Sequence, residues 1–214
     1  TSKFSERWGG WYVTGTHGKQ RHMGNVIVDA PKSLDKLDVE AGANVTDLSD
    51  HLRTSRYITP DSDIVALMVL GHQVLVHNHI AAANFSGRTI QRDAVVMNQA
   101  LERPQDFESD STLRRYTSAA EKVVEALLLV GEHRLTDPIS GPTTFAADFS
   151  ARGPFDSQGR SLRQFDLATR LFRYPCSFLI YSEAFDGLQD RVREQVYRRL
   201  WEVLTGEDQS KHFT

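Results

Sequence analysis

Residues 64–86 contain no Asp, Glu, Lys or Arg, and this uncharged stretch constrains the fold more than any other feature of the 214-residue chain. A run of this length can cross a membrane, but its three histidines, His72, His77 and His79, make insertion costly. A helix that is apolar on every side belongs in the middle of the core of a soluble protein. We therefore predict one long, largely buried helix and no transmembrane segment.

Helical patterns also cover most of the chain after this stretch. Thr59 and Pro60, followed by two aspartates, are typical of a helix start, so the long helix is expected to begin there. Residues 138–159 contain Gly-Pro breakers and predict a loop. Further helical segments are expected at residues 89–101, 109–135, 161–172, 175–185 and 188–204. The segment at residues 89–101 is expected to continue or restart the long helix. Gly206 is expected to end the segment at residues 188–204.

The first 60 residues are rich in glycine and turn formers. Residues 8–18 carry too many glycines for a stable helix, so extended or looped backbone pinned by aromatic side chains is expected. Residues 26–28 are a short candidate strand, and residues 30–50 read as a surface loop with a helical turn near residues 46–52. The predicted fold class is mainly α, an irregular helical domain with a glycine- and aromatic-rich N-terminal loop region.

No repeat or linker divides the chain, which predicts a single domain over residues 1–214. In this domain, residues 1–60 would pack on a helical core formed by residues 61–206.

Charge and cysteine content exclude several classes of protein. A net charge of −3 and a pI near 6.2 give no electrostatic reason to expect a nucleic acid or an anionic membrane as partner. The single cysteine, Cys176, excludes a disulfide within the chain and a zinc site of several thiolates, and we interpret it as a small buried residue. The chain starts with polar residues and without Met, so a mature or truncated product is expected rather than one with a signal peptide.

The histidines of the uncharged stretch need polar partners if they are buried. His72 and His79 lie two helical turns apart, about 10 Å, which is too far for both to bind one ion. His77 points away from their face. Two interpretations stay open: hydrogen bonds to neighbouring elements, or a metal or haem bound by at least one of the three. A further histidine, His133, is expected to cap the C-terminal end of the helix over residues 109–135.

A second group of candidate ligands lies in the irregular segment over residues 17–25. Its His17, His22 and Met23 are residue types that bind haem iron or copper, and a glycine-rich segment can deliver such a side chain to a flat cofactor. Trp8 and Trp11 would supply an apolar wall. The alternative is a structured loop in which these side chains only pack together.

Three segments carry a family resemblance: residues 7–25 with their Trp-Gly-Gly-Trp motif, residues 59–70, and residues 159–182. Together they resemble an uncharacterised group of bacterial, exported proteins that carry a cytochrome c domain. The resemblance spans nearly the whole chain and implies a haem cofactor and an exported or periplasmic location. In that family a Cys-x-x-Cys-His segment precedes the Trp-Gly-Gly-Trp motif, and this chain has none. Either the chain begins after that segment, with Met23 or His22 as second axial ligand, or this member has lost covalent haem.

Three functions are consistent with these observations. The first is an electron-transfer haem protein of the cytochrome c type, or a fragment or haem-less relative of one, with the helix of His72 walling the haem and a redox protein as partner. The second is a non-catalytic subunit of a larger exported or membrane-attached complex, in which the aromatic segment is a docking surface or buried prop. The third is a non-haem metal protein that uses His17, His22 and a histidine of the long helix. No reaction is predicted.

Overall fold

The computed structural model describes residues 2–27, 37–210, 212 and 213. It contains 45% helix and no strand among these residues, which confirms the predicted mainly-α class. The chain forms two compact units. Unit 1 comprises Thr1–Gly71 and Gly131–Tyr174, and unit 2 comprises His72–Val130 and Pro175–Thr214. The predicted single domain over residues 1–214 stays a prediction.

The uncharged stretch forms the first part of α1, Ile64–Ala100, which is 37 residues long. The helix begins at Ile64 because the Asp63 carboxylate Oδ1 accepts hydrogen bonds from the backbone N–H groups of Val65 (2.8 Å) and Ala66 (3.2 Å). The start predicted at Thr59 is therefore a few residues early. The segment predicted over residues 89–101 is a continuation of the same helix. α1 begins in unit 1 and runs on through unit 2.

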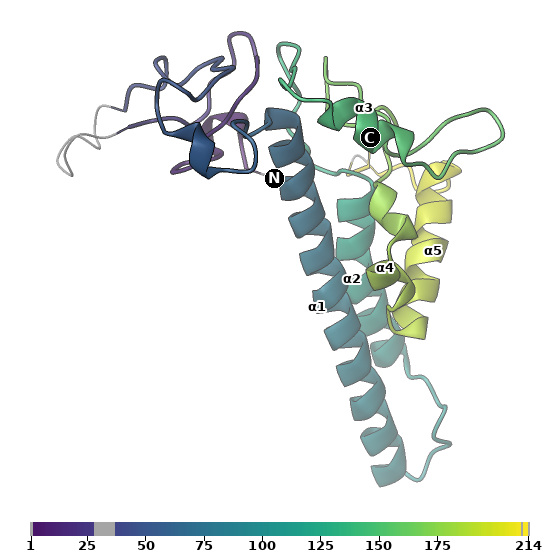
Figure 1. Cartoon of the computed structure of the whole chain (residues 1–214). Helices are drawn as coiled ribbons and strands as arrows, with labels where there is room; N and C mark the ends of the chain where they lie inside the picture. The colour runs from purple at the N-terminus through teal and green to yellow at the C-terminus, as the bar shows by residue number, and fades with distance from the viewer. Residues whose placement is uncertain (1, 28–36, 211, 214) are drawn as a thin grey trace. The chain divides into compact units, whose positions relative to one another are not determined.

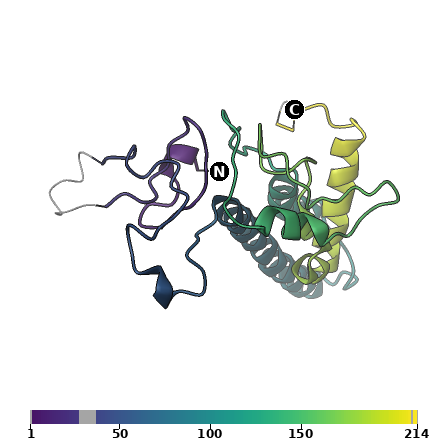
Figure 2. The ribbon, with the colours of Figure 1, turned by 45° about the horizontal axis from the view of Figure 1, so that its top comes forward.

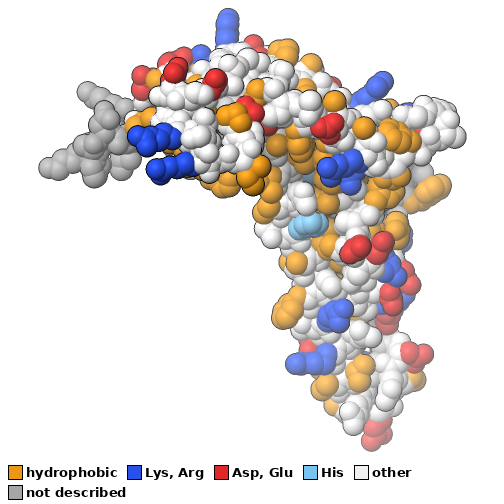
Figure 3. Space-filling view, viewed as in Figure 1, with side chains coloured by type: hydrophobic (Ala, Val, Ile, Leu, Met, Phe, Trp, Pro, Cys, Tyr) orange, Lys and Arg blue, Asp and Glu red, His pale blue; other side chains and the backbone are white. Residues whose placement is uncertain are grey.

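The expectation that this helix is largely buried is wrong. Val76 and Ile80 are buried, whereas Val74 is 49% and Phe85 is 75% exposed. Figure 3 shows hydrophobic side chains along the edge where α1 runs in Figure 1. By length and composition alone α1 can cross a membrane, and 33% of its apolar window is buried within the protein; a single helix of this kind is weak evidence for a span.

Unit 2 is built from helices that lie side by side with α1 (Figures 1 and 2). They are α2, Asp110–Leu127, and α5, Asp190–Leu204, with η4, Phe178–Tyr181, and α4, Glu183–Asp186, between them in sequence. α2 and α5 pack on each other through buried stripes formed by Tyr116, Ala120, Val123, Val124 and Leu127 on α2 and by Val192, Val196 and Leu200 on α5.

The helix ends of unit 2 are set by local contacts. The Ser109 hydroxyl caps α2 by accepting the N–H of Thr112 at 3.1 Å, as the predicted start at residue 109 requires. α2 nevertheless ends at Leu127, eight residues before the predicted end at residue 135. Beyond α5, Gly206 has a φ of 79°, which confirms the predicted glycine stop. The helix predicted over residues 175–185 is two short helical turns instead.

Unit 1 consists largely of loops. Its helical elements are η1, Phe4–Glu6, η3, Thr54–Arg56, and α3, Phe145–Ala151, besides the first turns of α1. α3 lies within residues 138–159, so the loop predicted there is wrong in part. The N-terminal segment is held by distant residues: Thr14 donates its N–H to the Ser62 carbonyl at 2.7 Å, and the Gln20 amide donates to the Asp137 carbonyl at 2.9 Å. Residues 1–60 therefore do not form a unit by themselves.

The helix predicted over residues 161–172 is absent. Phe165 and Phe172 instead form an antiparallel bridge, and their rings stack at 5.5 Å. The Asp166 carboxylate accepts the N–H groups of Ala168 and Thr169, both at 2.8 Å, and this local turn competes with the helix.

The predicted strand over residues 26–28 and the loop over residues 30–50 extend into residues 28–36, which lie outside the described residues. In their described parts, residues 26, 27 and 37–52 contain neither strand nor helix.

Candidate functional site

Three histidines of unit 1 gather around one phenylalanine. We call the side chains of Phe4, Trp8, His17, His22 and His133 the aromatic cluster. The Phe4 ring is only 2% exposed. Its centroid lies 5.4 Å from Trp8, 5.9 Å from His17, 6.1 Å from His22 and 5.9 Å from His133. The structure thus brings together three of the predicted site residues, Trp8, His17 and His22.

His17 is held through both ring nitrogens. Its Nδ1 lies 2.7 Å from the Gln20 carbonyl, and its Nε2 lies 3.0 Å from the backbone N–H of Asn44. These partners assign the proton to Nδ1, which donates, and leave Nε2 as the acceptor. Burial lowers the pKa of His17, although the Gln20 carbonyl opposes this shift. His17 is therefore a neutral core residue, and binding a metal would require it to give up a hydrogen bond.

His22 packs directly on His17, with ring centroids 4.6 Å apart, and on the edge of Trp8 at 5.3 Å. Its Nδ1 accepts the backbone N–H of Gly24 at 3.0 Å, so Nε2 carries the proton. Burial lowers the pKa of His22 to about 4, with further contributions from His17 and Arg21. The ring is neutral at pH 7 and only 2% exposed.

Close backbone packing positions this pair. A Cβ on Gly24 would lie 2.5 Å from Cγ2 of Val13 and 3.0 Å from Nδ1 of His22, so only glycine fits there. The Asn25 side chain pairs with the backbone of Val13, donating to its carbonyl at 2.7 Å and accepting its N–H at 2.8 Å. The glycines of the N-terminal segment thus allow close packing as well as turns of the backbone.

Of the remaining predicted site residues, Met23 and Trp11 belong to unit 1 and His72 to unit 2. Met23 is half-buried beside Gly9, where an added Cβ would lie 3.9 Å from its Cε. Trp11 is 55% exposed and does not wall the cluster. His72 belongs to unit 2, where its Nε2 lies 2.7 Å from the Ser177 hydroxyl, and burial lowers its pKa to about 4.

The fit of these residues to a haem or metal is poor in this arrangement. A histidine that binds haem iron needs a ring nitrogen with no other partner and with room for the iron about 2 Å away, as in other metal–imidazole bonds. Both nitrogens of His17 are engaged, and His22 is enclosed by Trp8, Phe4 and His17. Within the described residues, no three or more His, Cys, Asp or Glu side chains are grouped to hold a metal ion. We derive no chemical step through such a group.

The expected role of His133 as a helix cap is wrong, and sequence reasoning gave no role to its neighbour Glu132. His133 does not cap α2, which ends earlier, but stacks on Phe4 with an interplanar angle of 29°. Burial raises the pKa of Glu132, and the nearby Arg7 guanidinium opposes this shift. No spacing signal links these residues to Phe4, because more than a hundred residues separate them in the chain.

Comparison of this chain with protein-family models, with curated proteins and with solved structures gave no match. The resemblance to exported cytochrome-c-domain proteins therefore stays a prediction.

Proposed function

We propose that this protein is a non-catalytic subunit that docks onto a larger assembly through one exposed apolar face of α1. This face, defined as Val74, Ala81 and Phe85 in the part of α1 that belongs to unit 2, spans three helical turns, about 16 Å, with His77 and Asn78 in the intervening turn. Val74 is 49% and Phe85 is 75% exposed. Exposed apolar side chains grouped on one helix face of a folded protein are typical of an interaction site. This exposed face is the observation that carries the proposal.

The polar side chains of α1 support the same interpretation. His72 bonds to the Ser177 hydroxyl, and the Asn84 Oδ1 accepts the backbone N–H of Gln189 at 3.1 Å. Both contacts lie within unit 2, so these polar groups act as satisfied packing groups. His72 and Asn84 consequently need no ligand, and Val74 and Phe85 are exposed.

We propose a protein surface as the partner of this face rather than a membrane interior. A spanning helix must place its polar groups against other buried protein. Within unit 2, His72 and Asn84 of α1 bond to Ser177 and Gln189, the residues that cap η4 and α5. α5 itself carries charged side chains such as Arg193 and Arg198 that are incompatible with a lipid interior. A partner helix with an apolar stripe would bury the face without moving these contacts.

A double variant tests the proposal. Val74→Asp with Phe85→Asp places two charges on the face without touching a buried side chain, and Trp201→Asp, at a side chain 66% exposed on α5, is the matched control. Tagged full-length protein is purified from its native host, and assembly mass is measured by light scattering. We expect the wild type and the control in a larger complex, and the double variant as a free, folded subunit by circular dichroism. A double variant that still assembles would contradict the proposal.

The second candidate is the electron-transfer haem protein implied by the resemblance, together with its exported location and redox partner. One observation favours it: Nε2 of His22 makes no hydrogen bond among the described residues, and Met23 follows directly in the chain. An absorption spectrum and iron analysis of the intact gene product test it. A Soret band with stoichiometric iron supports this candidate, whereas a colourless, iron-free preparation rules it out. The non-haem metal protein ranks third, because both ring nitrogens of His17 already make hydrogen bonds.

A further inference from the structure

A pocket of about 360 Å³ lies in unit 1 and shares no residue with the face of α1 that carries the proposed function. Three aromatic side chains, Trp11, Tyr12 and Tyr57, line it together with the carboxylate of Asp61. Leu48, Leu52 and Pro60 add apolar surface. Its volume is in the range of small-molecule sites in proteins, which begins at about 300 Å³.

A tight turn creates the aromatic side of the pocket. The N–H of Trp11 donates to the Trp8 carbonyl at 3.0 Å, and Trp8 and Gly10 both have positive φ, at 62° and 79°. The turn sends the Trp8 ring inward onto His22 and leaves Trp11 at the surface. Trp11 is 55%, Tyr12 is 42% and Tyr57 is 63% exposed, so these rings are available to a ligand.

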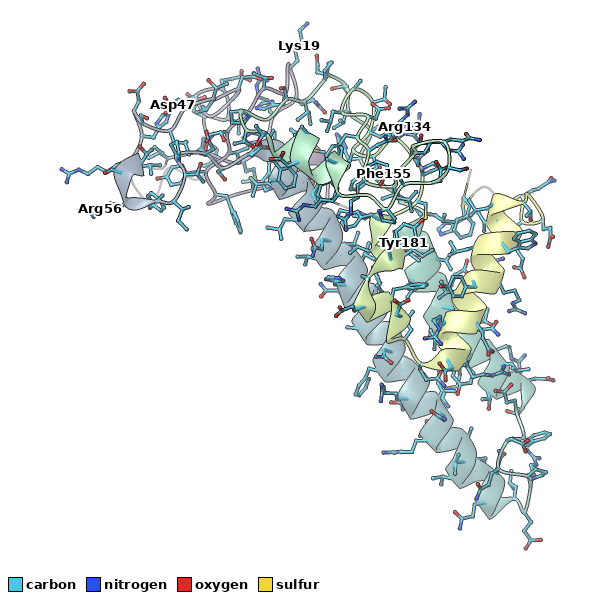
Figure 4. The ribbon with its side chains drawn as sticks, turned by 45° about the vertical axis from the view of Figure 1, so that its right-hand side comes forward. Lys19, Asp47, Arg56, Arg134, Phe155 and Tyr181 are labelled. Atoms are coloured by element: carbon cyan, nitrogen blue, oxygen red, sulfur yellow. The ribbon has the colours of Figure 1, made fainter. Side chains whose placement is uncertain are left out.

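Asp61 is a half-buried carboxylate with no cationic partner. Its Oδ2 accepts the Thr59 hydroxyl at 3.1 Å, and among the described residues no Lys, Arg or His lies within 4.0 Å of it. The pocket is lined by neither Lys nor Arg. Arg56, on the neighbouring η3, points outward and away from the rest of the unit (Figure 4). The pocket therefore has one uncompensated negative charge beside several aromatic rings.

We propose that this pocket binds a small alkylammonium cation, such as a quaternary trimethylammonium group. Aromatic faces attract such a cation through their quadrupoles and contact its methyl groups. Asp61 supplies a negative charge. A neutral apolar ligand would leave this charge unpaired, and an anion would be repelled by it. The same headgroup occurs in free choline and in phosphatidylcholine lipids, and the test separates these two sources.

Calorimetric titration of full-length protein with choline, and with its neutral isostere dimethylbutanol, measures the contribution of the charge. We expect choline to bind with saturation and the isostere to bind more weakly. Asp61→Asn keeps the shape and should reduce affinity for choline. Trp11→Leu and Tyr57→Leu should each weaken it by about 2- to 30-fold, the range for a cation–aromatic contact. Trp201→Leu, at an exposed tryptophan of unit 2, should leave affinity unchanged.

Sedimentation with vesicles separates the two sources of the cation. Binding to phosphatidylcholine vesicles but not to phosphatidylglycerol vesicles, lost in Trp11→Leu, assigns the lipid headgroup, whereas saturable binding of free choline alone assigns a soluble ligand. Equal binding of choline and isostere, full affinity in Asp61→Asn, or no binding of either probe by folded protein would each overturn the proposal. Circular dichroism melting curves confirm that each variant is folded.

Discussion

At the scale of single residues, the Trp-Gly-Gly-Trp motif separates two tryptophans that sequence reasoning placed in one wall. Trp8 contacts His22 at the edge of its ring, whereas Trp11 is more than half exposed. The positive φ of Gly10 turns the backbone between them, which is why a glycine is required at this position. The motif therefore joins the buried aromatic cluster of unit 1 to its surface.

Gly24 should be the most sensitive glycine of the aromatic cluster. In Gly24→Ala the new methyl group would meet Val13 and His22 at 2.5 and 3.0 Å, so we expect a loss of about 1–3 kcal/mol in the free energy of unfolding. Gly71→Ala is the matched control, because its methyl group meets no atom within 4 Å on exposed α1 and should stabilise by about 0.5–1 kcal/mol. Urea unfolding measures both. Equal effects of the two substitutions would refute the packing account.

The neutral histidines make stability depend on pH. The pKa values of His22 and His72 fall from 6.5 in the unfolded chain to about 4 in the folded protein, mainly because of burial. Between these values the unfolded state binds more protons than the folded state. The contribution of the neutral histidines to the free energy of unfolding is therefore fully present above pH 6.5 and is lost as the pH falls towards 4. We expect a slope of up to about 1.4 kcal/mol per pH unit for each histidine. Urea unfolding at several pH values measures it, and a flat profile across this interval would contradict the account.

At the scale of elements, the start of α1 depends on one carboxylate. Asp63 caps the helix through Oδ1, and its Oδ2 accepts the Thr143 hydroxyl at 2.5 Å. Gly141 gives this carboxylate room, because a Cβ there would lie 2.2 Å from both of its oxygens. The cap therefore ties α1 to the segment that precedes α3.

Asp63→Ala should cost about 2 kcal/mol of unfolding free energy, because it removes both the cap and a buried hydrogen bond. Asp61→Ala is the matched control, since its side chain reaches only Thr59 and the change should stay within about 0.5 kcal/mol. Thermal or urea unfolding of both variants measures the difference. A larger loss of unfolding free energy for Asp61→Ala than for Asp63→Ala would contradict this account and would favour the helix start predicted at Thr59.

Elements with strong local signals could be predicted from the sequence, and those fixed by distant contacts could not. The Ser109 cap and the Gly206 stop are both local and are confirmed. In contrast, the turn at Asp166 replaced a predicted helix, since a side-chain–backbone contact competed with a weak apolar pattern. Phe4, the ring partner of His133, and Asn44, one hydrogen-bond partner of His17, lie far from these histidines in the chain. Ligand-like residue types alone therefore could not distinguish packing from metal binding.

At the scale of the whole molecule, the two units carry different surfaces. Unit 1 holds the aromatic cluster and the aromatic pocket beside Asp61, and unit 2 holds the apolar face of α1. The sequence pattern identified the uncharged helix but not its outward face, because the number of helices available to cover it is a tertiary property. We thus propose a binding role for each of these two surfaces, whereas His17 and His22 are buried packing residues.

Site-specific photo-crosslinking tests the docking claim most directly. A photoreactive phenylalanine analogue is placed at Phe85, and in a second sample at Trp201, which is similarly exposed on α5. Full-length protein carrying either label is irradiated in its native host, and the products are identified by mass spectrometry. We predict one defined partner polypeptide crosslinked through position 85 and none through position 201. A protein that stays uncrosslinked at position 85, or crosslinks equally from both positions, would contradict the account.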